Sequence, residues 1–170
     1  MASKINTENI VFDKIKIDNY EFLYDILKQR SLPSANINSS MSVLPSYKQH
    51  VVWLNSDPYK IHAIVKYEDI PYGTVYIDKK DEIGIYTHNT QIRKIIKKYG
   101  RPENLGFNTF TNFIQKYTPD KFNGKVSILN THAVVMDNKL FTEWEWLQKH
   151  YNNTSWSDKE FIYYECIQKK

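Results

Sequence analysis

The stretch DEIGIYTHN (residues 81–89) places two side chains that can move protons at the two ends of one predicted strand, residues 82–87. Glu82 brings a carboxylate to its start, and His88, whose imidazole titrates near neutral pH, follows its end. A third such group, His132, follows another predicted strand at 124–130. Because positioned carboxylates and imidazoles act as general acids and bases, these three residues are the first candidates for catalysis.

Gly84 stands in the middle of the same predicted strand, where it adds no side chain and costs backbone entropy. A glycine inside a strand marks either a β-bulge that lets another chain approach, or an ordinary strand irregularity or tight packing under an aromatic ring. Taken by itself, the residue favours the second interpretation.

Composition excludes several classes of protein. The 170 residues fit one domain, and 41% hydrophobic with 25% charged residues is typical of a soluble globular protein. The net charge of +4 is small and scattered, so we expect no nucleic-acid partner. A single cysteine, no signal-type apolar run and no stretch near ~20 apolar residues predict a cytoplasmic protein without a membrane partner. The five histidines stand apart, which predicts no metal site.

The apolar periodicity predicts alternating helices and strands. Three apolar runs joined by short connections, between residues 60 and 87, predict an antiparallel meander. Asp18 and Glu21 have capping-box spacing at the start of the first helix. Strands are expected at 9–17, 60–68, 74–78, 82–87, 124–130 and 160–168, and helices at 18–30, 47–56, 90–100, 107–117 and 140–151. The order predicts one α+β domain around a mixed sheet, with a long polar loop at 31–46.

Residues 44–89, LPSYKQHVVWLNSDPYKIHAIVKYEDIPYGTVYIDKKDEIGIYTHN, resemble the GNAT superfamily of acyl-CoA-dependent N-acetyltransferases. They are similar to the branch that includes acetyltransferases of amino groups on nucleotide-activated sugars. The resemblance implies a mixed, mostly antiparallel central sheet flanked by helices, in which strand four (82–87) splays from strand five (124–130). It implies a bulge at Gly84, and a backbone N–H near Ile85 or Tyr86 that stabilises the oxyanion.

The resemblance also implies acetyl-CoA as the cofactor, held by residues Ile85, Tyr86, Thr87, Gln91, Arg93, Lys94 and Asn130. Gln91 matches the family's pyrophosphate loop, Gln/Arg-x-x-Gly-x-Gly/Ala, but Lys94 and Ile96 occupy its glycine positions. Three interpretations stay open. The basic residues hold the phosphates by charge; the anion site lies instead at 99–108; or CoA binding has been lost.

For the chemistry, the resemblance makes Glu82 the first candidate for the base that takes the proton of the amine, with His88 as the alternative. The family often uses a tyrosine, on the helix after strand five, to protonate the leaving thiolate. No tyrosine of this sequence falls clearly there, so His132 is the candidate donor.

The acceptor is expected against the N-terminal helices and the 31–46 loop, with contacts from His50, Trp53, Tyr59 and the loop residues Ser34, Asn36, Asn38 and Ser39. The expected activity moves acetyl from acetyl-CoA to a primary amine of a small acceptor, an amino sugar or sugar nucleotide. Alternatives are a protein N-acetyltransferase and a GNAT-like module that binds a ligand or partner without turnover. A homodimer is also compatible with the resemblance.

Overall fold

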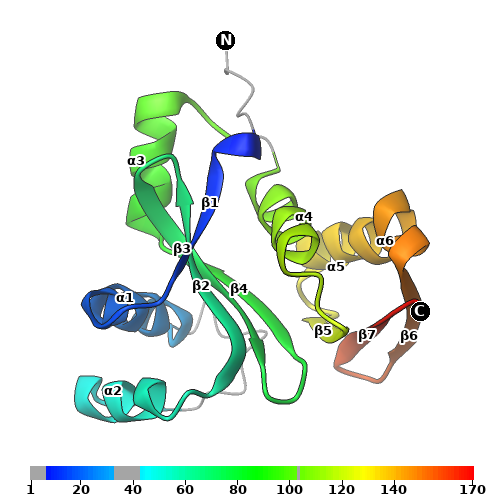
Figure 1. Ribbon diagram of the computed structural model, residues 1–170, viewed down its shortest axis with the longest axis horizontal. Helices are drawn as coiled ribbons and strands as arrows, with labels where there is room; N and C mark the ends of the chain where they lie inside the picture. The colour runs from blue at the N-terminus through cyan, green and yellow to red at the C-terminus, as the bar shows by residue number, and fades with distance from the viewer. Residues whose placement is uncertain (1–6, 33–42, 103) are drawn as a thin grey trace.

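The computed structural model describes residues 7–32, 43–102 and 104–170, so the loop residues Ser34, Asn36, Asn38 and Ser39 lie outside the described residues. The strands form two sheets (Figure 1). The first has the order β1-β2-β3-β4, all antiparallel, with β1 (Ile10–Lys14), β2 (Tyr59–Tyr67), β3 (Ile70–Asp78) and β4 (Ile83–Thr87). The second has the order β5-β7-β6, with β5 (Lys121–Ser127), β6 (Tyr151–Ser157) and β7 (Phe161–Gln168). The predicted α+β class and the antiparallel meander are confirmed.

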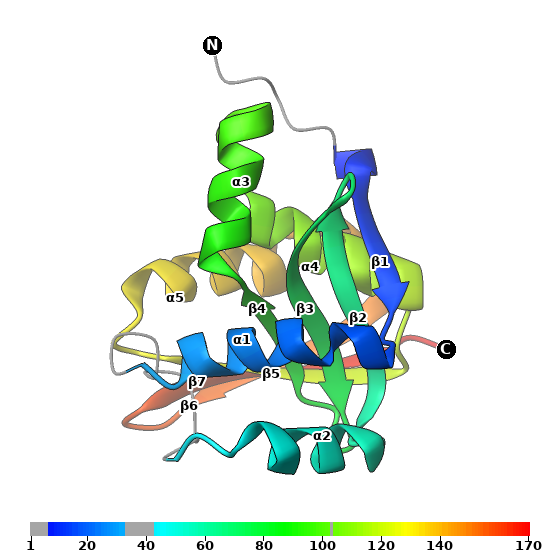
Figure 2. The same ribbon diagram turned by 90° about the vertical axis from the view of Figure 1, so that its left-hand side faces the viewer.

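Helices cover both faces of the first sheet. The α-helices of the described residues are α1 (Tyr20–Arg30), α2 (Tyr47–Asn55), α3 (Asn89–Tyr99), α4 (Leu105–Tyr117), α5 (Thr131–Asn138) and α6 (Glu145–His150), of which α5 and α6 lie beside the second sheet. In Figure 2, α1 and α2 cross in front of the sheet and α4 lies behind it. The alternation of side chains along β2 explains this arrangement, because Ile64 packs with Leu23 and Leu54 of α1 and α2, whereas Ala63 and Val65 face the main core. In the described part of the chain, no helix is long and apolar enough to cross a membrane.

Strands β4 and β5 are joined at their beginnings and then separate. A single parallel bridge pairs Glu82 with Asn123, and the Asn123 amide donates to the Asp81 carbonyl at 2.7 Å. Beyond that bridge the described residues of β4 pair only with β3, and those of β5 only with β7. Figure 1 shows the two sheets on either side of this junction. The predicted splay of strands four and five is therefore confirmed.

Gly84 does not form a bulge. It pairs with Tyr76 in a continuous register between β3 and β4, so the bulge that the resemblance implied is wrong. A Cβ atom at Gly84 would lie 2.6 Å from Cε1 of Tyr76 and closer still to Cζ. The glycine is needed because the Tyr76 ring lies directly over it. Packing under an aromatic ring is one of the two explanations, besides an ordinary strand irregularity, that the residue alone favoured.

The C-terminal third differs most from the prediction. Strand five begins and ends earlier than the predicted 124–130. The predicted helix at 140–151 is divided: α5 precedes it, a π-helical turn covers Lys139–Glu143, and α6 ends at His150. Strand β6 was not predicted, because an edge strand with the sequence YNNTSWS and mostly exposed side chains lacks an apolar signal.

The first helix also begins differently. Asp18 makes no cap; instead the Asn19 carboxamide oxygen accepts from the Lys16 amide at 2.8 Å, across a short 3₁₀ turn at Ile17–Asn19. This turn also ends the first strand at Lys14, before the predicted residue 17. By contrast, α3 stops at Gly100 as predicted, where φ is 90°, a conformation that favours glycine.

Candidate active site

The gap between β4 and β5 holds a cavity of about 210 Å³, here called the cleft cavity. One wall is β4 and the opposite wall is β5. Helices α4 and α5 and the π-helical turn close the remaining side. The lining residues are Glu82, Ile83, Gly84, Ile85, Tyr86, Phe110, Gly124, Lys125, Val126, Ala133, Asp137 and Phe141.

On the β5 wall of the cleft cavity, Gly124 faces an aromatic ring. A Cβ at Gly124 would lie 3.2 Å from Cζ of Phe141, which itself stacks on Tyr164 with ring centroids 4.2 Å apart. The cleft is therefore rimmed by backbone on both strands and by fixed rings behind them. An extended chain could lie along β4 and form strand-like hydrogen bonds with its free edge.

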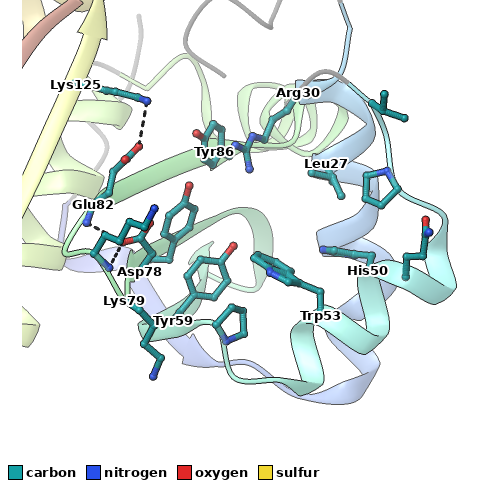
Figure 3. A pocket seen from close by; sticks show the side chains of 16 residues that line it. Leu27, Arg30, His50, Trp53, Tyr59, Asp78, Lys79, Glu82, Tyr86 and Lys125 are labelled. Atoms are coloured by element: carbon teal, nitrogen blue, oxygen red, sulfur yellow. Dashed lines mark hydrogen bonds and ion pairs between the residues drawn. The ribbon is translucent and has the colours of Figure 1, made fainter. Parts of the chain in front are cut away.

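A larger cavity of about 750 Å³, here called the aromatic cavity, lies on the other side of β4, beneath α1 and α2 (Figure 3). Its rings form a connected series: the Tyr59 and Tyr76 centroids are 4.5 Å apart, and those of Tyr76 and Tyr86 are 6.0 Å apart. The Arg30 guanidinium lies 3.4 Å from the centroid of Tyr86. Such surfaces stack well on planar or sugar rings.

The two cavities share a wall. Glu82, Tyr86 and Lys125 line both of them, so a molecule in one cavity can meet a molecule in the other at the start of β4. The Glu82 carboxylate lies 4.0 Å from the Lys125 ammonium, and its side chain is 43% exposed. Figure 3 shows this pair at one end of the aromatic cavity. Of the three predicted acid–base residues, Glu82 is the one that lies where both cavities meet.

The three predicted acceptor contacts that lie outside the 31–46 loop all line the aromatic cavity. His50 is buried and stacks on Trp53 with centroids 5.9 Å apart, and Tyr59 packs edge-on against Trp53. Burial lowers the pKa of His50, so it stays neutral at neutral pH. Its Nδ1 has no hydrogen-bond partner among the described residues, which leaves one polar atom of this wall unsatisfied.

His88 and His132 lie away from both cavities. The His88 ring stacks on Phe22 of α1 with centroids 5.4 Å apart, while its backbone begins α3. It lies at the opposite end of β4 from Glu82, because a five-residue strand separates them. His132 is exposed in the first turn of α5. The structure therefore does not bring these two histidines together with Glu82.

The predicted cofactor residues are divided. Ile85 and Tyr86 line the cleft cavity, and Thr87 ends β4 with an exposed side chain. Gln91 donates from Nε2 to the Pro71 carbonyl at 3.0 Å, so its amide is engaged by β3. Asn130 caps α5, where its side-chain oxygen accepts from the Ala133 amide at 3.2 Å.

The basic side chains of Arg93 and Lys94 are exposed on α3. The alternative anion region, 99–108, contains the start of α4, where a Cβ at Gly106 would meet nothing within 4 Å. Among the described residues, no group of three or more His, Cys, Asp or Glu side chains could hold a metal ion.

Sequence reasoning missed Arg30, Tyr76, Lys125 and Asp137. Arg30 ends α1, far from β4 in sequence, and Lys125 belongs to a strand whose start was misplaced. Asp137 lies on α5, within a segment for which no helix was predicted. A signal for Tyr76 did exist, since an aromatic residue opposite a strand glycine is a known way to cover it.

No protein-family model and no curated protein matches the sequence. Solved structures do match over almost the whole chain. A spermidine N-acetyltransferase from Vibrio cholerae, solved with CoA and spermine, is 10% identical, has a TM-score of 0.64, and is matched over 95% of this chain and 96% of its own. The N-acetyltransferase PseH from Campylobacter jejuni, solved with acetyl-CoA, is 16% identical and has a TM-score of 0.54; the match covers 94% of this chain and 99% of that one.

An acetyltransferase from Thermus thermophilus is 12% identical and has a TM-score of 0.55; the match covers 96% of this chain and 98% of that one. Sequence identities this low establish the shared fold and leave the acceptor open, since the similar proteins differ in what they hold. The chain has the fold of the N-acetyltransferases, in the arrangement that the resemblance to the GNAT superfamily implied.

Proposed function

We propose that this protein is an N-acetyltransferase that moves acetyl from acetyl-CoA to a primary amine of a small acceptor, an amino sugar linked to a nucleotide. The observation that carries the proposal is the separation of β4 from β5 beyond the Glu82–Asn123 bridge, with a cavity in the gap. Acetyl-CoA supplies the acetyl group as a thioester at the end of an amide-containing arm.

The residues present fit that donor. The free edge of β4 offers backbone N–H and C=O groups to the amides of the arm, as a neighbouring strand would. The alternation of hydrogen bonds with β3 turns the backbone N–H of Ile85 toward the free edge, where it stabilises the negative charge that develops on the carbonyl oxygen. Because Glu82 lies where the two cavities meet, its carboxylate accepts the proton of an amine that enters from the aromatic cavity, directly or through water.

The charge of the aromatic cavity supports an anionic acceptor. Its lining contains four cations, Arg30, Lys79, Lys80 and Lys125, against the two carboxylates Asp78 and Glu82. The excess of cations suits phosphate oxygens, and the rings suit a base or a sugar. A polyamine such as spermine, which a similar protein holds, would meet like charge here.

A thiol-release assay tests the proposal. Acetyl-CoA is combined with amino-sugar nucleotides, free amino sugars, spermidine and peptides with a free N-terminus. We expect release with the first class, a fall of about 10²-fold or more for Glu82→Gln, and no change for Glu143→Gln, a carboxylate outside both cavities. Release only with peptides would instead identify a protein N-acetyltransferase.

A module that binds without turnover is favoured by one observation: Lys94 and Ile96 occupy the two glycine positions of the pyrophosphate loop, and one of the two N–H donors on Nε2 of Gln91 is already bonded to the Pro71 carbonyl. Thermal unfolding with acetyl-CoA distinguishes the two functions. A donor at about 100 times its Kd stabilises the native state by about 3 kcal/mol. We expect that shift, and we expect Arg93→Gln with Lys94→Gln to reduce it if the phosphates lie on α3. No shift at millimolar acetyl-CoA would remove the transferase proposal.

A further inference from the structure

One wall of the cleft cavity contains an isolated carboxyl group, that of Asp137. Helices α4 and α5 and the π-helical turn contribute Phe110, Ala133, Asp137 and Phe141 to this cavity, and Asp137 is the ionisable residue of that set. Its carboxyl has no hydrogen-bond or salt-bridge partner among the described residues. A carboxyl held in an apolar wall without a cation favours its neutral form.

The charged and titratable groups that face the Asp137 carboxyl do not reverse its preference for the neutral form. On the opposite walls, the Glu82 carboxylate and the Lys125 ammonium lie 4.0 Å from each other, so this cation already has a carboxylate close to it. From β7, Tyr164 interacts electrostatically with Asp137 but carries no positive charge. Burial raises the pKa of Asp137 to about 7. At neutral pH the neutral and ionised forms of the carboxyl are therefore both well populated, so the side chain can give up a proton and take one back.

The position of that proton matters for acetyl transfer. If the thioester lies between β4 and β5 with its carbonyl toward β4, Glu82 stands on the acceptor side and Asp137 on the α5 side of the same cavity. Two carboxyl groups in different environments then divide the acid and base roles between them. Resting on the proposed function, we propose that Asp137 is the general acid that protonates the departing thiolate of CoA.

The step balances as follows. The amine nitrogen forms a bond to the acetyl carbonyl carbon, and the carbon–sulfur bond breaks with its electron pair left on sulfur. The Asp137 carboxyl transfers its proton to that sulfur and becomes a carboxylate. The proton lost by the amine leaves through Glu82 and water, and Asp137 takes up a proton from solvent before the next turnover. Asp137 thus fills the role that sequence reasoning gave to His132.

The test compares Asp137→Asn with Glu143→Gln, a matched carboxyl-to-amide change on the π-helical turn after α5. We expect kcat for acetyl-CoA to fall by about 10²-fold or more in Asp137→Asn, with the acetyl-CoA thermal shift retained and Glu143→Gln unchanged. In the unaltered protein kcat should decline as pH rises through the ionisation of Asp137, and Asp137→Asn should lose that decline.

A second readout needs no turnover. The side-chain carboxyl ¹³C resonance of Asp137, assigned by its absence from Asp137→Asn, should titrate near neutral pH in the ligand-free protein. Titration below pH 5, or a kcat that Asp137→Asn leaves unchanged, would overturn the assignment and leave the proposed function intact. Absence of thiol release from the unaltered protein with every amine would remove the proposed function and this role together.

Discussion

The packing of Tyr76 over Gly84 gives the sharpest prediction about stability. In Gly84→Ala the new methyl group would start 2.6 Å from Cε1 of Tyr76, whereas ordinary contact begins at 3.4 Å. The ring would have to move by about 0.8 Å at that atom, and by more at Cζ. It cannot move freely, because Tyr59 and Tyr86 lie on either side of it.

The cost follows from this geometry. Forcing an extra methyl group into a filled site costs about 1–3 kcal/mol, and the smaller entropy of the unfolded alanine chain returns about 0.4–1 kcal/mol. The difference between these two figures is about 0 to 2.6 kcal/mol, and because the overlap with the Tyr76 ring is deep we expect Gly84→Ala to lower the free energy of unfolding by about 1–2.6 kcal/mol. Guanidinium chloride unfolding at 25 °C, followed by circular dichroism, measures it.

Two controls make the test specific. Gly106→Ala is the same substitution in the first turn of α4, where a Cβ meets nothing within 4 Å, so it should be neutral or stabilise by up to about 1 kcal/mol. In a double-mutant cycle, Tyr76→Leu should make Gly84→Ala nearly neutral, while Tyr76→Phe, which keeps the ring, should not. A Gly84→Ala protein as stable as the unaltered one would refute the packing argument.

Three further measurements test the structure. Burial raises the pKa of Asp137 in the folded protein to about 7 from an ordinary 3.8, so ionisation of this carboxyl lowers the free energy of unfolding as pH rises between these values. Asp137→Asn should therefore be more stable than the unaltered protein at pH 8, by at most about 4 kcal/mol, and equally stable below pH 4; equal stability at pH 8 would contradict this. Burial lowers the pKa of His62 in the folded protein to about 4, so the unfolded state takes up a proton first and the free energy of unfolding falls by at most about 3 kcal/mol as pH falls from 6.5 to 4. In urea unfolding, His62→Gln should reduce this dependence of stability on pH. Asn130→Ala should lower the free energy of unfolding by about 1 kcal/mol, because α5 loses its cap, and thermal unfolding measures this. A loss of acetyl-CoA binding energy far larger than that would show that Asn130 also contacts the donor.

The sequence was informative where the signal is local. Period-two alternation and short turns located the meander from β2 to β4, and the apolar spacing with Gly100 located α3. The resemblance in residues 44–89 then placed Glu82 beside the splayed strands, and the structure puts it at the wall that both cavities share. Each of these features is recorded in residues that are neighbours along the chain.

The sequence alone therefore determined the fold class, the antiparallel meander and the side chains of β4. Only the tertiary structure showed that Tyr76 explains Gly84, that Arg30 stacks on Tyr86, and that Asp137 lines the cleft. Periodicity reports which face of an element is buried, but it carries no information on which distant element covers that face. Cavities, and the pKa values of groups inside them, arise from contacts between segments far apart in sequence, so they exist only once the chain has folded.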